Sequence, residues 1–288
     1  MTQIITHIVP EQSTPTRLQD YGVGIFDAFP TKSALKKALK KNYITVNGKI
    51  ASTATYISGG ETIVLTLPKQ VSSHKKFNFK LNVIFEDDYL AVIHKPAGIL
   101  VSGNHFKTIA NALIQNLEPS SLPDATKPQP VHRLDYATTG ILLTGKTSTS
   151  IRTLNKLFET KQIRKTYFAV TIGNMPNTED IITSSIDGKS ATSQYKVIKT
   201  VSSPRFAKLN LVKLEPQTGR RHQLRIHLSQ LGNPILGDKD YGIKDLILHG
   251  KGMYLHACAL EFTHPFTKEN INLKSELPKR FEKIFYSN

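Results

Sequence analysis

Apolar positions in the first 70 residues predict a small domain of two helices and a β-hairpin. From residue 17 to residue 29 the apolar side chains recur at helical spacing, which predicts a first helix. Ser33 stands before a second apolar run of helical period and is the predicted N-cap of a second helix. In ITVNGKIA, Asn47 and Gly48 separate two strand-like runs, and both residues tolerate the positive φ of a tight hairpin turn.

Beyond residue 80 the pattern mixes strand and helix periods. Two short apolar runs flank an acidic turn over 83–94, helical spacing returns over 107–117 and 148–159, and the proline-rich stretch 118–130 is predicted to be a surface connection. Alternation typical of strands follows in SQYKVIKT and FAKLNLVKL. Because these strands follow one another without a helix between them, the pattern predicts an α+β fold with a mostly antiparallel, mixed sheet.

A polar and basic segment separates these two regions. The residues PKQVSSHKKFNFK, 68–80, lie between the last strand-like run of the first region and the first run of the second. We therefore expect a small domain over 1–70, a linker over 71–80 and a larger domain over 81–288.

Composition narrows the possible partners of the chain. Its 38 Lys and Arg against 22 Asp and Glu give a formal net charge of +16 and an isoelectric point near 9.8, which favours nucleic acid. An anionic membrane surface would fit the same charge, but the sequence has no run of about 18 apolar residues and no signal-peptide pattern. The single cysteine, Cys258, allows no intramolecular disulfide. These features predict a soluble, cytoplasmic protein without a membrane partner.

Five short motifs follow one another between residues 94 and 242. The central one, VHRLDYATTGILL, places the carboxylate of Asp135 two residues after Arg133, at the start of an apolar run. HKPAGILV precedes it, and KTYFAV, PQTGRRHQLRIHL and GNPILGDKDYG follow it. Single short motifs are weak evidence, whereas several in a fixed order are strong. From about Asn82 to Pro265 the chain resembles the RluA family of RNA pseudouridine synthases.

This resemblance implies a reaction and a fold. The reaction is the isomerisation of specific uridines to pseudouridine in structured ribosomal or transfer RNA, after the target base has left the stack. The fold is a mostly antiparallel sheet with a basic cleft across its centre. Because an isomerisation requires no oxidant or energy source, we expect no cofactor, and the histidines lack the spacing of a metal site.

The resemblance also implies the catalytic residues. Asp135 acts at the sugar, either as a nucleophile on the anomeric carbon or as a base on the neighbouring carbon. Arg225 pairs with Asp135 and keeps it ionised. Tyr167 supplies a flat ring that stacks on the flipped base. From the residues alone, Asp135 could instead be a turn or capping residue, and Tyr167 a strand aromatic of the core.

Other residues of the larger domain are predicted to hold the RNA. We expect contacts from Arg133, Lys95, Arg220 and His222, with the cations at phosphates. His132 and His222 are also suited to orienting neighbouring groups by hydrogen bonds.

The first domain resembles the S-four type of RNA-binding module over about Thr16 to Leu65. Two helices, the VNGK turn and a Gly-Glu-x-Ile strand carry this resemblance. It implies an RNA-binding helix face made of four lysines, Lys36, Lys37, Lys40 and Lys41. The alternative is an ordinary solvated helix face. We expect a monomer whose partner is ribosomal or transfer RNA.

Two other functions stay open at this point. A non-catalytic RNA-binding or assembly factor could keep the same fold, but the presence of Asp135, Tyr167 and Arg225 argues against it. A nucleic-acid N-glycosylase would also flip its target base, but it would release the base instead of rejoining it.

Overall fold

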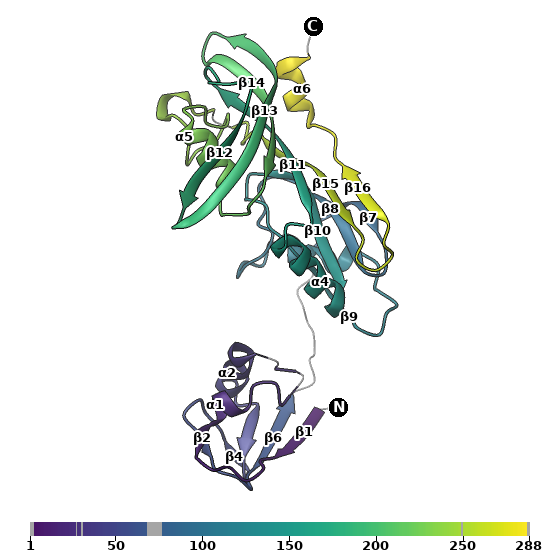
Figure 1. Ribbon diagram of the computed structural model, residues 1–288. Helices are drawn as coiled ribbons and strands as arrows, with labels where there is room; N and C mark the ends of the chain where they lie inside the picture. The colour runs from purple at the N-terminus through teal and green to yellow at the C-terminus, as the bar shows by residue number, and fades with distance from the viewer. Residues whose placement is uncertain (1–2, 27, 30, 68–76, 249, 287–288) are drawn as a thin grey trace. The chain divides into compact units, whose positions relative to one another are not determined.

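The computed structural model (Figure 1) describes residues 3–26, 28–29, 31–67, 77–248 and 250–286. The chain divides into two compact units, Met1–Lys75 and Lys76–Asn288. Within the predicted linker, residues 71–76 lie outside the described residues. Phe77 and Phe79 pack against the core of the second unit, with 5.4 Å between their ring centroids. The second unit therefore begins before Leu81.

The N-terminal unit contains a four-stranded antiparallel sheet with the strand order β1-β6-β3-β4, and a separate pair of β2 with β5. An apolar core that includes Leu35, Leu39 and Ile63 holds its elements together. The apolar pattern predicted no strand at β1, which pairs with β6 along its whole length. The elements are β1 (Gln3–Ile8), β2 (Thr16–Arg17), α1 (Leu18–Tyr21), α2 (Lys32–Lys40), β3 (Ile44–Val46), β4 (Lys49–Ile50), β5 (Tyr56–Ile57) and β6 (Thr62–Leu67).

The helix predicted over 17–29 is wrong beyond its first turn, since α1 ends at Tyr21. Gly22 follows, and a Cβ there would lie 2.9 Å from a side-chain carbon of Leu35, so the chain turns where it packs against α2. Gly24 has a φ of 80°, outside the helical region. Two glycines thus override the apolar period.

The structure has the second helix and the hairpin at their predicted places. The N-cap of α2 is Thr31, not Ser33, because the Thr31 hydroxyl accepts a hydrogen bond from the Ala34 N–H at 3.2 Å. Asn47 and Gly48 join β3 to β4 with φ values of 47° and 74°, as a tight hairpin turn requires.

The second unit is built on a ten-stranded sheet. Its main order is β12-β13-β14-β11-β15-β10-β8-β7, with β16 added to β15 and β9 added to β10. Adjacent strands pair antiparallel except β10 with β15, so the mixed, mostly antiparallel sheet is confirmed. The strands are β7 (Asn82–Glu86), β8 (Leu90–Lys95), β9 (Ala125–Pro130), β10 (Thr139–Thr147), β11 (Arg164–Ile172), β12 (Glu179–Ile186), β13 (Lys189–Ser203), β14 (Ala207–Pro216), β15 (Leu255–Thr263) and β16 (Asn270–Lys274).

The stretch 118–130 is not only a connection, because its second half forms β9 and pairs with β10. Prolines are tolerated there since β9 lies off the main path of the sheet, where ladder hydrogen bonds can be missing. The helix predicted over 107–117 is only one α-helical turn, α3 (Ile109–Ala112), followed by the 3-10 helix η1 (Leu113–Gln115). Two other predictions agree with the structure: β7 and β8 flank the acidic turn, and α4 has the predicted bounds Ser148–Glu159.

Helices pack along both halves of the sheet (Figure 1). In Figure 1, α5 lies beside β12, and α4 lies beside β10. Within the described ranges, no helix is long and apolar enough to cross a membrane. The remaining helices are α3 (Ile109–Ala112), η1 (Leu113–Gln115), α5 (Gln223–Gln230), η2 (Lys244–Leu246) and α6 (Lys279–Phe285).

The two halves of the sheet join at one short parallel pairing, Thr139 with His256 and Gly140 with Ala257. Gly140 has a φ of 119°, and a Cβ there would lie 2.1 Å from the carbonyl oxygen of Ala257. Only glycine permits this close approach. The junction places the loop before β10, which carries Asp135, at the middle of the sheet.

Candidate active site

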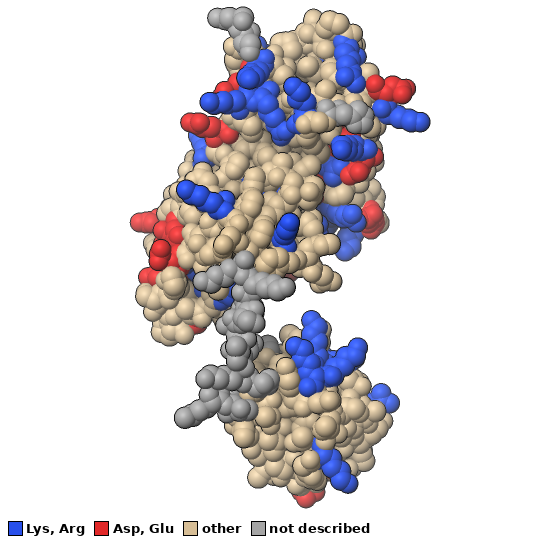
Figure 2. Space-filling view, turned by 180° about the vertical axis from the view of Figure 1, so that it is seen from behind, with Lys and Arg blue, Asp and Glu red and all other residues tan. Residues whose placement is uncertain are grey.

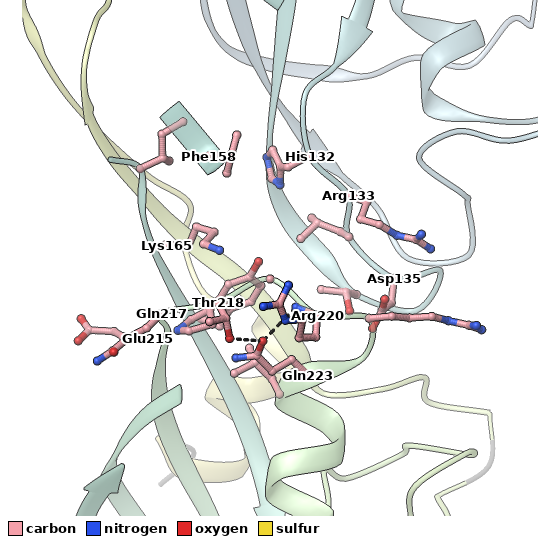
Figure 3. Close-up of a pocket in the computed structure, with 18 of the residues that line it drawn as sticks. His132, Arg133, Asp135, Phe158, Lys165, Glu215, Gln217, Thr218, Arg220 and Gln223 are labelled. Carbon is pink, nitrogen blue, oxygen red and sulfur yellow. Dashed lines mark hydrogen bonds between the residues drawn. The ribbon is translucent and has the colours of Figure 1, made fainter. Parts of the chain in front are cut away.

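Three of the five motifs line one cavity of about 1080 Å³ in the second unit (Figure 3). Its walls come from the loop before β10, from the segment joining α4 to β11, and from the segment joining β14 to α5. The cavity brings together six residues that were predicted for catalysis or RNA binding: Asp135, Tyr167, Arg225, Arg133, Arg220 and His222.

Asp135 is held at the cavity wall by its own turn, in which the Thr138 N–H donates to the Asp135 carbonyl at 3.1 Å. The side chain is 17% exposed. One carboxylate oxygen lies 3.6 Å from Nη1 of Arg225 and the other lies 3.7 Å from Nε2 of His222. Both distances are too long for a hydrogen bond. Among the described residues the carboxylate therefore has cationic and polar neighbours but no bound donor, which leaves its oxygens free to react.

Lys95 is not available to RNA, contrary to the prediction. It is fully buried, and its ammonium donates to the carbonyls of Pro96, Tyr136 and Thr138 at 3.0, 3.3 and 2.8 Å. Burial lowers the pKa of Lys95 to about 8, although the charge of Asp135 opposes this. These bonds tie the HKPAG turn to the turn that carries Asp135, so Lys95 positions the carboxylate.

Arg225 is fixed on α5 by two further carboxylates. Its Nε and Nη2 lie 2.7 Å from Asp238, and Nη2 lies 2.6 Å from Asp240. Burial lowers the pKa of Arg225, but the hydrogen bonds that it donates to Asp238 and Asp240 outweigh this effect and raise the pKa overall. The guanidinium therefore stays charged, with Nη1 directed at Asp135.

The sequence motif GNPILGDKDYG predicted no role for its two acids, Asp238 and Asp240. Asp238 is buried, and its carboxylate also accepts from the backbone N–H groups of Asp240 and Tyr241 at 3.0 and 3.2 Å. A usable signal was present: an arginine expected beside a reacting carboxylate needs further acids to fix it when it is buried.

His222 is the N-cap residue of α5 and has the left-handed conformation, with a φ of 55°. This conformation costs energy for a residue other than glycine, so the surroundings must hold it. Its Nδ1 lies 2.9 Å from the hydroxyl of Tyr241. Burial lowers the pKa of His222, although Asp135 opposes this, and the ring is therefore neutral near pH 7.

Tyr167 lies on β11 directly after a register shift in its pairing with β15. The ring lines the cavity and packs against two apolar cores of the unit. Burial raises the pKa of its phenol, and the charge of Asp135 adds to this effect. The phenol therefore stays protonated, and the ring forms a fixed wall beside Asp135.

The other predicted RNA-binding residues lie in two places. Arg133 and Arg220 are exposed at the cavity, where Nε of Arg220 donates to the Ser190 carbonyl at 3.1 Å. The four lysines of the N-terminal unit are exposed on α2 or just after it: Lys36, Lys37, Lys40 and Lys41. Figure 2 shows a compact group of Lys and Arg side chains on that unit. Across the described part of the chain, no three His, Cys, Asp or Glu side chains form a metal-binding group.

Comparisons with known proteins agree on one family. The model described as RNA pseudouridylate synthase matches residues 89–230. The chain is 33% identical to ribosomal large subunit pseudouridine synthase C of Rickettsia felis, covering 88% of this chain and 91% of that protein. It is 30% identical to an uncharacterized RNA pseudouridine synthase of Aquifex aeolicus, covering 90% of each.

A solved structure supports the same assignment. Human RNA pseudouridylate synthase domain containing 4 is similar with a TM-score of 0.56 and 26% identity, over 69% of this chain and 90% of that chain. The residues matched by the family model include the cavity-lining Asp135, Tyr167 and Arg225. The chain therefore belongs to the RluA family of RNA pseudouridine synthases, isomerases that act on uridine in RNA.

Proposed function

We propose that this protein converts uridine to pseudouridine in ribosomal RNA, with Asp135 as the reacting carboxylate. One observation carries the proposal: the Asp135 carboxylate has no bound donor among the described residues, yet it lies 3.6 Å from a guanidinium that two other acids hold in place. The substrate class rests on relatives from Rickettsia felis and Vibrio cholerae, which are named ribosomal large subunit pseudouridine synthases C and D.

The reaction divides naturally between these groups. The bond from C1′ of the ribose to N1 of uracil breaks, a bond from C1′ to C5 forms, and the proton on C5 is replaced by one on N1. Asp135 supports the positive charge that develops at the sugar, as a nucleophile at C1′ or as a base at the neighbouring carbon. Arg225 holds a positive charge 3.6 Å from the Asp135 carboxylate.

Tyr167 completes the pocket for the base. A flipped pyrimidine needs a flat partner to replace the stacking it leaves behind. The Tyr167 ring lies in the cavity wall near Asp135 and is fixed by the cores behind it. We assign it to the stacking contact that holds the detached base while it turns.

The charge of the cavity fits an RNA backbone. Its walls carry only three acids, Asp135, Glu159 and Glu215, against the following seven cations: Arg133, Lys161, Arg164, Lys165, Arg220, Arg221 and Arg225. We therefore assign this cavity to the basic cleft that the family resemblance implies. We also assign the N-terminal unit, an S-four-like module, to additional RNA affinity through its exposed lysines.

Mapping pseudouridines in total RNA from cells with and without this gene tests the proposal. One or a few uridines of the large ribosomal RNA should lose the modification. Purified protein and a fragment of that RNA then separate the alternatives, because isomerisation leaves the mass of the RNA unchanged, whereas a glycosylase lowers it. An assembly factor without catalytic activity would leave every uridine unmodified.

A further inference from the structure

We infer that Lys165 and His132 form a phosphate-binding subsite for the nucleotide next to the target uridine. The inference rests on the proposed function and adds two substrate-binding residues to it. Neither residue touches the reacting atoms, and Lys165 was not among the predicted RNA-binding residues.

Lys165 is a cation without a partner among the residues that the structure describes. It lies on β11, half-buried in the cavity wall, and its ammonium makes no hydrogen bond or ion pair with any of the described residues. Burial lowers its pKa, so the surroundings do not compensate its charge. In Figure 3 its side chain points into the cavity, on the side occupied by His132.

The nearby acids are already paired with other lysines. Glu215 lies 2.8 Å from Lys213, and Glu159 lies 3.0 Å from Lys156. Asp135, the third acid of the cavity, faces Arg225 and His222. Burying a cation without a counter-charge is unfavourable, so this arrangement favours an anion that arrives with the substrate.

His132 offers a second donor to the same space. Its Nε2 accepts a hydrogen bond from the Leu143 N–H at 2.9 Å, which places the ring proton of the neutral imidazole on Nδ1. Burial lowers the pKa of His132 to about 3, and the charge of Lys165 adds to this effect, so the ring is neutral near pH 7. Phe158 fixes the ring, with 4.7 Å between centroids. The Nδ1–H has no acceptor within the described ranges.

The spacing fits a phosphate beside the flipped nucleotide. Lys165 precedes Tyr167 by two residues on one strand, so the two side chains lie on the same face about 7 Å apart. A cavity of about 1080 Å³ exceeds the needs of a single base and leaves room for its backbone. A compact ammonium and a neighbouring N–H are a common pair for phosphate oxygens.

The test uses an RNA stem-loop that contains the uridine mapped in cells. In two versions, the phosphate on the 5′ or the 3′ side of that uridine is made neutral as a methylphosphonate. With wild-type protein, one of the two should raise KM about tenfold and leave kcat within about twofold, since a charge-assisted contact is lost. Lys165→Met should raise KM for the natural RNA by a similar factor, and Lys165→Arg should restore most of it.

The decisive result is the combination. If Lys165 binds that phosphate, the neutral linkage should cost Lys165→Met nothing further, whereas Lys161→Met, at an exposed lysine of the same cavity, should keep the full sensitivity. Two results would overturn the subsite. In the first, each neutral linkage raises the KM of Lys165→Met as much as it raises the KM of wild-type protein. In the second, Lys165→Met has the KM of wild-type protein for the natural RNA. If wild-type protein forms no pseudouridine, the proposed function fails instead, and the same comparison made on binding affinity still tests the subsite.

Discussion

Two cations of the cavity, Arg225 and Lys165, differ in how many hydrogen-bond and ion-pair partners they have. At the reacting end, Arg225 has two carboxylates at hydrogen-bonding distance and a third, Asp135, at 3.6 Å. At the other end, Lys165 has no partner among the residues that the structure describes, and the nearby acids are bonded elsewhere. The difference separates two tasks: a charge that must stay in place during a reaction is fixed beforehand, and a charge that must receive a ligand is left open.

Lys95 also differs from Lys165 in its hydrogen-bond partners. Like Lys165, it is a lysine on a strand of the second unit, but its ammonium donates hydrogen bonds to three carbonyls. Lys95 therefore contributes to the placement of Asp135, and only a cation with free hydrogen-bonding capacity can contribute to the binding of RNA.

Removing the charge of the Asp135 carboxylate should have the largest effect. Asp135→Asn should lower pseudouridine formation by at least about 10³-fold, because the amide keeps the shape but cannot act as nucleophile or base. RNA affinity should stay within a few-fold of wild type. Mass-spectrometric assay of purified protein and a binding titration measure both, and turnover within tenfold of wild type would refute the role of Asp135.

Removing one of the two carboxylates that hold Arg225, Asp238 or Asp240, should have the next largest effect. Asp238→Asn should lower kcat on the order of 10²-fold and destabilise the fold by about 3 kcal/mol, because it breaks a buried ion pair. Asp240→Asn is the matched control: the Asp240 side chain is 64% exposed and that of Asp238 is 0% exposed, so its effects should be much smaller. Equal effects of the two variants would contradict the conclusion that the buried Asp238 is the main residue holding Arg225.

Removing the aromatic ring of Tyr167 should lower kcat by a smaller factor. Tyr167→Ala should lower kcat at saturating RNA by about tenfold, since it removes the partner of the flipped base. Tyr167→Phe keeps the ring and should remain near wild type. A change in KM alone would instead make Tyr167 a binding residue, and a large loss in Tyr167→Phe would assign the role to its hydroxyl.

Charge on the N-terminal unit should affect binding and spare chemistry. Replacing Lys36, Lys37, Lys40 and Lys41 with Gln should reduce the salt dependence of RNA binding by a slope of about 3, as expected when four phosphate contacts are lost. The value of kcat at saturating RNA should change less than about twofold. An unchanged salt slope would show that these lysines form only a solvated helix face.

The pH dependence of stability should report the neutral state of His132. Its pKa is lowered to about 3 in the folded protein, so the unfolded chain binds the extra proton between about pH 6.5 and 3. Stability should therefore be lost as the pH falls through this window, by up to about 2 kcal/mol between pH 6.5 and 5. His132→Asn should lack this component in denaturant titrations. The same slope in both proteins would assign the acid sensitivity to other groups.

The sequence by itself determined the features that depend on neighbouring residues. The Asn47–Gly48 turn, the helix at Ser148–Glu159 and the strand alternation after residue 193 follow from local spacing and turn chemistry. The motifs around Asp135 indicated the family in the same way, because their residue types and order are visible without a structure.

Only the tertiary structure decided which charged side chains are buried and which groups they contact. Lys95 bonds to carbonyls up to 43 residues away, and Arg225 is held by acids of a loop that the sequence left without a role. Gly22 ends α1 where the chain packs against Leu35, although the apolar period continues. In each case the outcome depends on segments brought together by folding, and the cost of burying a charge or closing a gap does not appear in local spacing.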